Sequence, residues 1–127
     1  MNKIKSFRDL LVWQKAHLLT LAVYQETKKF PSDEKFGLTS QLRRSVSSVP
    51  TNIVEGYARN GSKEFGHFLN IARGSVEETK YHLILAKDLG YLSEEKFQAL
   101  FSLCDEAGRM LFALQTKVRA PKASSSN

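Results

Sequence analysis

LTSQLRRSVSSVPTNIVEGYAR, residues 38–59, carries two stripes of side chains at helical spacing. The apolar stripe consists of Leu42, Val46, Val49, Ile53 and Tyr57. The polar stripe consists of Gln41, Arg44, Ser48, Asn52, Glu55 and Arg59. Because an α-helix completes a turn about every 3.6 residues, each stripe stays on one face. The polar side chains can satisfy one another's hydrogen bonds, so this face is either a buried polar seam between helices or a recognition surface.

Three further segments show helical periodicity, and no segment has the pattern of a strand. They run from about Phe7 to Lys29, from about Lys63 to Leu89, and from Ser93 to near Lys117. Short loops between long helices favour antiparallel neighbours. The sequence therefore predicts an all-α fold, an antiparallel up-down-up-down four-helix bundle over residues 1–119. Pro121 and the serines that follow predict a disordered C-terminal tail over residues 120–127.

Pro50 lies inside the second predicted helix. A proline lacks the backbone donor that would bond the carbonyl of Val46, so the sequence predicts a kink or a break at this point. Both stripes keep their phase across Pro50, which favours one kinked helix. Ser47 and Ser48 are placed to help satisfy the disturbed turn.

Other local signals mark helix ends and helix contacts. Ser6 and Asp9 form the pattern of a capping box at the start of the first helix. Ser62 follows an Asn-Gly turn and is expected to be the N-cap of the third helix. Gly56 and Gly74 are expected at close contacts between helices, because a glycine lets two backbones approach.

The first predicted helix is apolar around most of its circumference. Its apolar residues are Leu10, Leu11, Trp13, Ala16, Leu18, Leu19, Leu21, Ala22, Val23 and Tyr24. A helix at the edge of a small bundle buries only one face. The excess predicts a second buried surface and hence self-association.

The net charge of +6 lies at the two ends of the chain. Residues 1–8 and residues 117–127 each carry three basic and no acidic side chains, whereas residues 9–116 carry 13 of each sign. Basic ends can act as arms on phosphate groups, or they can be solubilising tails. Both interpretations remain open at the level of sequence.

Length and composition indicate one globular domain in a reducing cytoplasm. The chain has 127 residues and a single cysteine, Cys104, so it forms no intrachain disulfide. No apolar run approaches the roughly 18 residues that span a membrane. The first residues lack the long apolar core of a secretory signal. We therefore expect a cytoplasmic protein without membrane contact.

The sequence offers little for catalysis or metal binding. Di-metal bundles use two Glu-x-x-His pairs, and this chain has one, Glu64 with His67, so we expect no metal site. His17 and His82 lack a carboxylate three residues earlier and are expected at the surface or partly buried. Cys104 is expected to be a small residue of the hydrophobic core. No phosphate-binding glycine loop is present. We expect that the protein is not an enzyme and binds no cofactor. A catalytic pair made by a serine or cysteine and a histidine that folding brings together stays an open alternative.

Several stretches make the chain similar to the four-helix bundle proteins encoded in intervening sequences of bacterial 23S rRNA genes. They are FRDLLVWQKA (7–16), FPSDEKFGLTSQLRRSVSSVPTNIVEGYAR (30–59), KEFGHFLNIARGSVEET (63–79) and DLGYL (88–92). The most specific part is the S-V-P-x-N-I-x-E-G pattern from Ser48 to Gly56. That family, whose biochemical function is unknown, resembles the accessory variability protein of diversity-generating retroelements. The resemblance implies a bundle that forms a homopentamer, with a role in binding nucleic acid or a partner protein.

Two roles compete for the charged residues of this signature and its neighbours. In the first, Arg43, Arg44, Arg59, Lys63 and Arg73 line a groove for RNA phosphates. In the second, a structural polar network joins Arg44, Asn52, Glu55 and Glu77 within or between subunits. A carboxylate would repel a phosphate but favours a guanidinium, so the second role suits Asn52 and Glu55 better.

The function expected from sequence is a non-enzymatic oligomeric scaffold that binds RNA or another nucleic acid through basic residues. The alternative is a protein-interaction adaptor that binds no nucleic acid. No stretch interleaves aromatic and basic residues as a platform for single strands.

Overall fold

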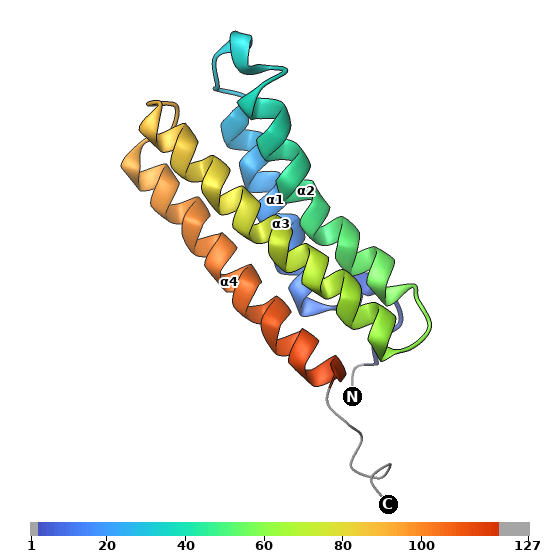
Figure 1. Cartoon of the computed structure of the whole chain (residues 1–127). Helices are drawn as coiled ribbons and strands as arrows, with labels where there is room; N and C mark the ends of the chain where they lie inside the picture. Colours follow the sequence, from blue (N-terminus) through green and yellow to red (C-terminus); the bar gives the residue numbers. More distant parts are fainter. Residues whose placement is uncertain (1–2, 120–127) are drawn as a thin grey trace, which may run out of the picture.

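The structure, a computed structural model, describes residues 3–119. Within them the secondary structure is entirely helical. Its elements are η1 (Phe7–Asp9), α1 (Leu11–Thr27), η2 (Ser32–Glu34), α2 (Leu38–Tyr57), α3 (Ser62–Asp88) and α4 (Glu94–Arg119). Consecutive long helices run antiparallel (Figure 1), so the predicted four-helix bundle is confirmed. The predicted tail over 120–127 lies outside the described residues.

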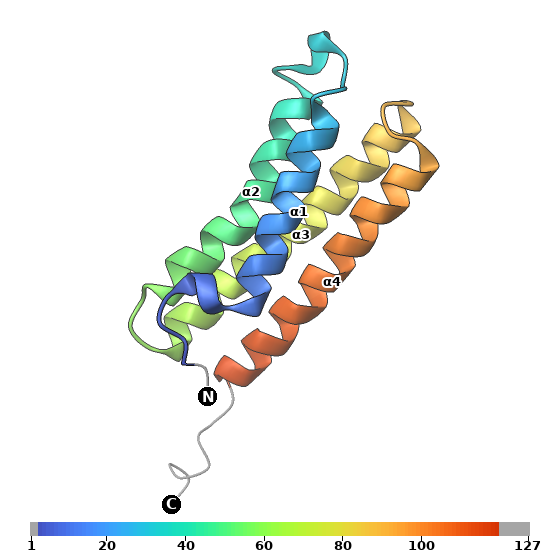
Figure 2. The ribbon, with the colours of Figure 1, turned by 180° about the vertical axis from the view of Figure 1, so that it is seen from behind.

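Each helix contacts two others, which closes the bundle around one core. α2 packs on α1 and α3, and α4 packs on α3 and α1, as the view from behind also shows (Figure 2). All four helices bury apolar residues at helical spacing. The largest fully buried apolar side chains are Leu19, Leu42, Ile53, Leu69, Leu83 and Leu111. Full burial of each such side chain stabilises the fold by roughly 1.5–3 kcal/mol, so this core supplies the main driving force.

The start of the first helix differs from the sequence prediction. The capping box of Ser6 and Asp9 is present, but it caps the short 3-10 turn η1. Leu10 has an extended backbone, with ψ of 123°, so α1 begins only at Leu11. Two contacts hold η1 against α1: the Phe7 ring lies 5.0 Å from the Trp13 ring, and the Gln14 amide donates to the Arg8 carbonyl at 2.8 Å.

α2 continues through Pro50 as one helix, as predicted. The carbonyl of Val46, which the proline leaves without its helical donor, accepts a hydrogen bond from Thr20 Oγ1 of α1 at 3.3 Å. The expectation that Ser47 and Ser48 serve this turn was wrong, because Ser47 donates to the Arg44 carbonyl and Ser48 bonds Ser75. The disturbed turn is therefore satisfied by a neighbouring helix, which ties α1 to α2.

The glycines behave differently from one another. A Cβ on Gly56 would lie 2.8 Å from Phe68 Cβ, so the predicted close contact exists there, between α2 and α3. A Cβ on Gly74 would meet nothing within 4 Å, so the same prediction for Gly74 was wrong. Ser62 is not the N-cap of α3 either. Gly61 is the N-cap instead. Its φ of 95° is positive, a backbone conformation that glycine adopts without steric strain.

These two helical glycines give a matched test of the α2–α3 contact. Gly56→Ala should lower the free energy of unfolding by about 1–3 kcal/mol, because the new methyl group collides with Phe68. Gly74→Ala should raise it by about 0.5–1 kcal/mol, because alanine favours helix and the space is open. Urea unfolding measures both. Equal effects of the same sign would contradict this account.

Candidate nucleic-acid interface

One end of the bundle gathers most of the excess positive charge. The start of α1, the turn between α2 and α3, and the end of α4 meet there (Figure 2). We define the basic end by its cationic residues, Lys3, Lys5, Arg8, Arg59, Lys63, Lys117 and Arg119. The acidic residues of the same segments are Asp9, Glu55 and Glu64. The basic residues of segments 3–8 and 117–119, remote in sequence, therefore lie at the same end of the bundle.

The opposite end of the bundle carries no such excess. Its basic residues are Lys28, Lys29, Lys35, Lys87 and Lys96. Its acidic residues are Glu26, Asp33, Glu34, Asp88, Glu94 and Glu95. The charge of the described chain is thus polarised along the bundle, which favours approach of a polyanion from one direction.

Two cations at the basic end share one hollow. Ser62, Lys63 and Arg119 line a depression of about 270 Å³. The Arg119 side chain lies along α3, since a Cβ on Gly66 would be 3.1 Å from Arg119 Nε. Both cationic side chains are exposed, so they can bind phosphate oxygens without first losing a buried partner.

Arg59 is held in place at the edge of the same surface. Its guanidinium lies 4.9 Å from the centre of the Phe68 ring and 3.1 Å from Glu55 Oε1. About half of each charged side chain is exposed. An exposed pair of this kind contributes little to stability, so Arg59 keeps donors for a ligand.

The structure places the five predicted RNA-binding residues on separate surfaces. Arg59 and Lys63 belong to the basic end. Arg43 packs on α1, donating to Thr27 Oγ1 at 2.8 Å, and Arg73 packs on α4, donating to Gln115 Oε1 at 2.8 Å. Arg44 is exposed on α2. The five do not line one groove in a single chain, and a role for each in binding stays a prediction.

The predicted polar network is also distributed within one chain. Asn52 donates to Ser48, Glu55 pairs with Arg59, and Glu77 lies 3.6 Å from Lys80. Among the described residues, Arg44, Asn52, Glu55 and Glu77 make no hydrogen bond or ion pair with one another. A network between subunits stays a prediction.

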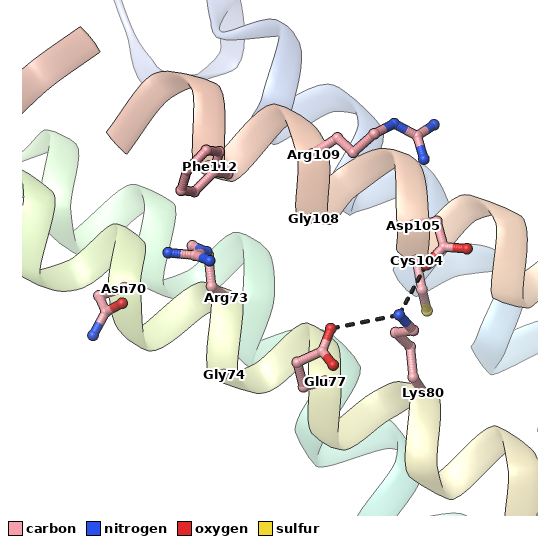
Figure 3. Close-up of a pocket in the computed structure, with 10 residues that line it drawn as sticks. All are labelled: Asn70, Arg73, Gly74, Glu77, Lys80, Cys104, Asp105, Gly108, Arg109 and Phe112. Carbon is pink, nitrogen blue, oxygen red and sulfur yellow. Dashed lines mark ion pairs between the residues drawn. The ribbon is translucent and has the colours of Figure 1, made fainter. Parts of the chain in front are cut away.

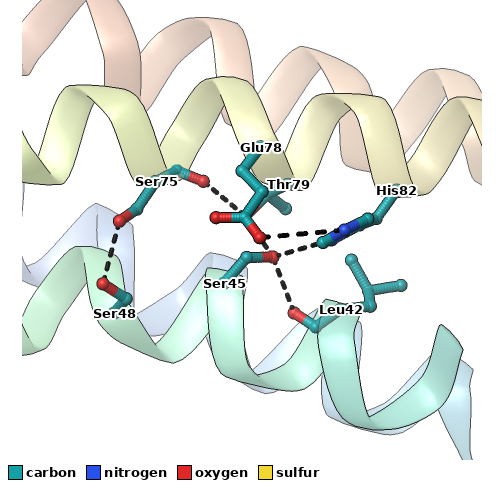
Figure 4. Close-up of polar contacts among 7 residues, drawn as sticks. All are labelled: Leu42, Ser45, Ser48, Ser75, Glu78, Thr79 and His82. Atoms are coloured by element: carbon teal, nitrogen blue, oxygen red, sulfur yellow. Dashed lines mark hydrogen bonds and ion pairs between the residues drawn. The ribbon is translucent and has the colours of Figure 1, made fainter. Parts of the chain in front are cut away.

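A different polar seam joins α2 to α3. We call it the hydroxyl seam, and Figure 4 shows its members Ser45, Ser48, Ser75, Thr79 and His82. Asn52, which donates to Ser48 Oγ at 2.9 Å, completes it. Ser48 Oγ and Ser75 Oγ are 2.8 Å apart, and Thr79 Oγ1 donates to Ser45 Oγ at 3.1 Å. Within residues 3–119 every buried side-chain nitrogen or oxygen has a hydrogen-bond partner. The seam is thus fully satisfied, as a buried polar contact must be.

His82 is buried, so its expected place at the surface or only partly buried was wrong. The residue is 5% exposed, and its Nδ1 lies 3.1 Å from Ser45 Oγ. Burial lowers the pKa of the imidazole, Glu78 opposes this with its carboxylate 3.8 Å from Nε2, and Arg44 lowers the pKa further. One signal was present in the sequence: Ser45, Ser48 and Asn52 have three- and four-residue spacings that Ser75, Thr79 and His82 reproduce in reverse order.

A groove of about 790 Å³ runs between α3 and α4 (Figure 3). At one end Arg73 lies over the Phe112 ring, with the guanidinium 4.8 Å from the ring centre. Phe112 is 55% exposed. This aromatic and basic pair was not predicted from the sequence, because 39 positions separate its members.

Cys104 lies at the groove but is fully buried, which confirms its assignment to the core. Burial raises the pKa of its thiol to about 12, so the sulfur stays protonated and a poor nucleophile.

Two other findings concern residues 3–119 alone. No three His, Cys, Asp or Glu side chains in this part of the chain gather in a way that could hold a metal ion. None of its helices combines the length and the apolar character that crossing a membrane requires.

Comparison with known proteins gives one family and one fold. Residues 8–113 match the family model described as 23S rRNA-intervening sequence protein. A crystal structure from Bacteroides thetaiotaomicron VPI-5482, described as a protein with unknown function from the S23 ribosomal protein family, superposes with a TM-score of 0.78 at 24% identity. The match covers 84% of this chain and 96% of that one. No curated protein matches the chain.

Acid should weaken the fold through His82. Burial lowers the pKa of the His82 ring in the folded chain, whereas the ordinary value near 6.5 applies in the unfolded chain. As the pH falls, the imidazole is therefore protonated in the unfolded state before it is protonated in the folded state. The free energy of unfolding should be constant above about pH 7 and fall below about 6.5. Urea unfolding between about pH 7.5 and 5 measures the slope, which should shrink in His82→Gln.

His82→Gln should also cost about 1–3 kcal/mol at neutral pH, because the buried bond between Ser45 and the imidazole is lost. Hydrogen bonds lower the pKa of the Glu34 and Glu94 carboxyl groups below the usual value of a glutamate, so both titrate outside this window. The same slope in wild type and variant would show that His82 is not the group responsible.

Proposed function

The chain belongs to the family of 23S rRNA-intervening sequence proteins, and on this basis we propose that it is a non-enzymatic, oligomeric scaffold that binds RNA through its basic end. The observation that supports the proposal is that the basic residues of segments 3–8 and 117–119 lie at the same end of the bundle as the turn that holds Arg59 and Lys63.

Phosphate contacts would supply the affinity. Each cation that neutralises a phosphate releases condensed counterions, so binding weakens steeply as salt rises. Arg59 supplies a planar fork of donors held on Phe68, and Lys63 and Arg119 supply exposed charges beside their common hollow. Such contacts fix position on an RNA without reading its sequence.

The oligomeric part of the proposal is supported by the outer face of α1. Leu11, Leu18 and Leu21 are 60%, 56% and 53% exposed. At about 100° per residue the three lie within an arc of about 80°, so they form one apolar stripe. Exposed stripes of this kind favour protein contact. A second copy of the chain is the proposed occupant, and a pentamer is what the family resemblance implies.

The same stripe favours the alternative function, an adaptor that binds another protein and no nucleic acid. The two functions differ in their ligand. The adaptor needs the α1 stripe and not the basic end, whereas the RNA scaffold needs the basic end.

RNA binding should depend on charge at one end only. We expect structured ribosomal RNA to bind at low salt. The triple variant Arg59→Gln/Lys63→Gln/Arg119→Gln should lower the affinity at least about tenfold and flatten the salt dependence, because up to three phosphate contacts are lost. The matched control, Lys28→Gln/Lys29→Gln/Lys35→Gln, removes the same charge from the opposite end and should change affinity little. Fluorescence anisotropy at two salt concentrations measures both.

Two outcomes of that titration would contradict the proposal. If the wild-type protein binds no RNA at low salt, the adaptor function takes its place. If both triple variants lose affinity equally, net charge rather than the basic end is responsible.

Self-association should depend on the α1 stripe. Light scattering of the wild-type protein at micromolar concentration should give a mass above that of one 14.4 kDa chain. Leu18→Glu/Leu21→Glu should lower this mass, because two carboxylates would be buried at the contact. Phe36→Glu, at an 89% exposed residue of the opposite end, is the control and should not change the mass. A wild-type monomer would contradict the oligomer.

A further inference from the structure

The groove between α3 and α4 is hollow because two glycines face it. Gly74 of α3 and Gly108 of α4 both line it, and a Cβ on Gly74 would meet no atom within 4 Å. A Cβ on Gly108 would come no closer than 3.7 Å to Val76. The volume of about 790 Å³ is in the range of small-ligand sites. This hollow lies on the flank of the bundle, apart from the basic end.

One end of the groove presents an ordered aromatic and basic pair. Arg73 is fixed by its bond to Gln115, which in turn donates to the Gly66 carbonyl at 3.1 Å. The guanidinium lies over the Phe112 ring, which remains more than half exposed. Unpaired bases of RNA stack on aromatic rings and on guanidinium planes, and both surfaces are present here. Asn70 lies beside them, and its amide can both donate to and accept from the edge of a base.

Charge within the groove is divided along its length (Figure 3). The two carboxylates are both bound by Lys80, whose Nζ lies 2.8 Å from Asp105 and 3.6 Å from Glu77. Arg109 makes no ion pair with any residue of 3–119, and Arg73 bonds only a neutral amide there. The end with Arg73 and Phe112 therefore keeps positive charge for an anion. At the other end Lys80 binds both carboxylates, and Arg109 extends toward that side from one turn of α4 away from Phe112 (Figure 3).

We propose that this groove binds an unpaired nucleotide of RNA, with its base at Phe112 and Arg73 and its phosphate at Arg109. The inference rests on the function proposed above and names a second, single-stranded contact for the same ligand. Asn70 is seven residues along α3 from Lys63, a rise of about 10 Å, so one RNA can reach both surfaces. A duplex keeps its bases stacked inside, so it can engage the basic end but not the groove.

The first test compares two RNAs of equal length, a hairpin with an unpaired loop and a fully paired duplex. Phe112→Ala and Arg109→Gln should each weaken hairpin binding roughly tenfold and leave duplex binding unchanged. Phe112→Tyr keeps the ring and should retain hairpin affinity. Phe36→Ala removes an exposed phenylalanine at the opposite end and is the control. Equal loss for both RNAs, or no loss for the hairpin, would overturn the inference.

The second test follows backbone amide signals by NMR while a short single-stranded RNA is added. Gly74 and Gly108 report on the groove, Gly61 reports on the basic end, and Gly90 lies in the turn at the opposite end. We expect the first three to shift and Gly90 to stay. If Gly61 shifts without Gly74 and Gly108, the groove is no nucleotide site but the proposed function stands. If none of the four shifts, both proposals fail.

Discussion

The close contact between α2 and α3 is the constraint on which the rest of the bundle depends. Hydroxyl bonds of 2.8 and 3.1 Å across the seam require short side chains, and Gly56 leaves room for Phe68 at another close contact of the two helices. These distances fix where α3 lies along α2. The other helices follow, since α4 packs on α3, and α1 is tied to α2 by the bond from Thr20 to the carbonyl that Pro50 leaves free. A proline inside a helix is tolerated here because a neighbouring helix supplies the missing donor.

The same topology explains why the charge becomes polarised. An even number of antiparallel helices returns the chain to the end at which it began, so the first and last described residues lie close to the turn between α2 and α3. Two basic segments that are remote in sequence thereby join Arg59 and Lys63. The positive field of a single surface is stronger than that of two separate tails, and it is what a phosphate backbone would meet first.

Periodicity in the sequence was sufficient for the fold but not for the site. The stripes of residues 38–59 predicted the face that α2 buries, and short loops predicted the antiparallel order. Periodicity does not say which side chain of another helix lies opposite. The Thr20 bond to Val46, the burial of His82 and the stacking of Arg73 on Phe112 all join different helices, and each was missed. The start of α1 was missed for another reason: a capping box looks the same whether it precedes an α-helix or a 3-10 turn.

The polar stripe of α2 is divided between a seam within the protein and an exposed end. In its middle Ser48 bonds Ser75 of α3 and Asn52 donates to Ser48, whereas Arg59 at its end belongs to the basic end. Three arginines on separate surfaces share one further property: Arg43, Arg59 and Arg73 each lie within 5 Å of an aromatic ring centre. A guanidinium held on a ring has already lost much of its rotational freedom, so it loses less on meeting a ligand than a free lysine does. Rigid arginines at the edges and flexible lysines at the end would let the bundle combine loose attraction of RNA with a defined site for one of its bases.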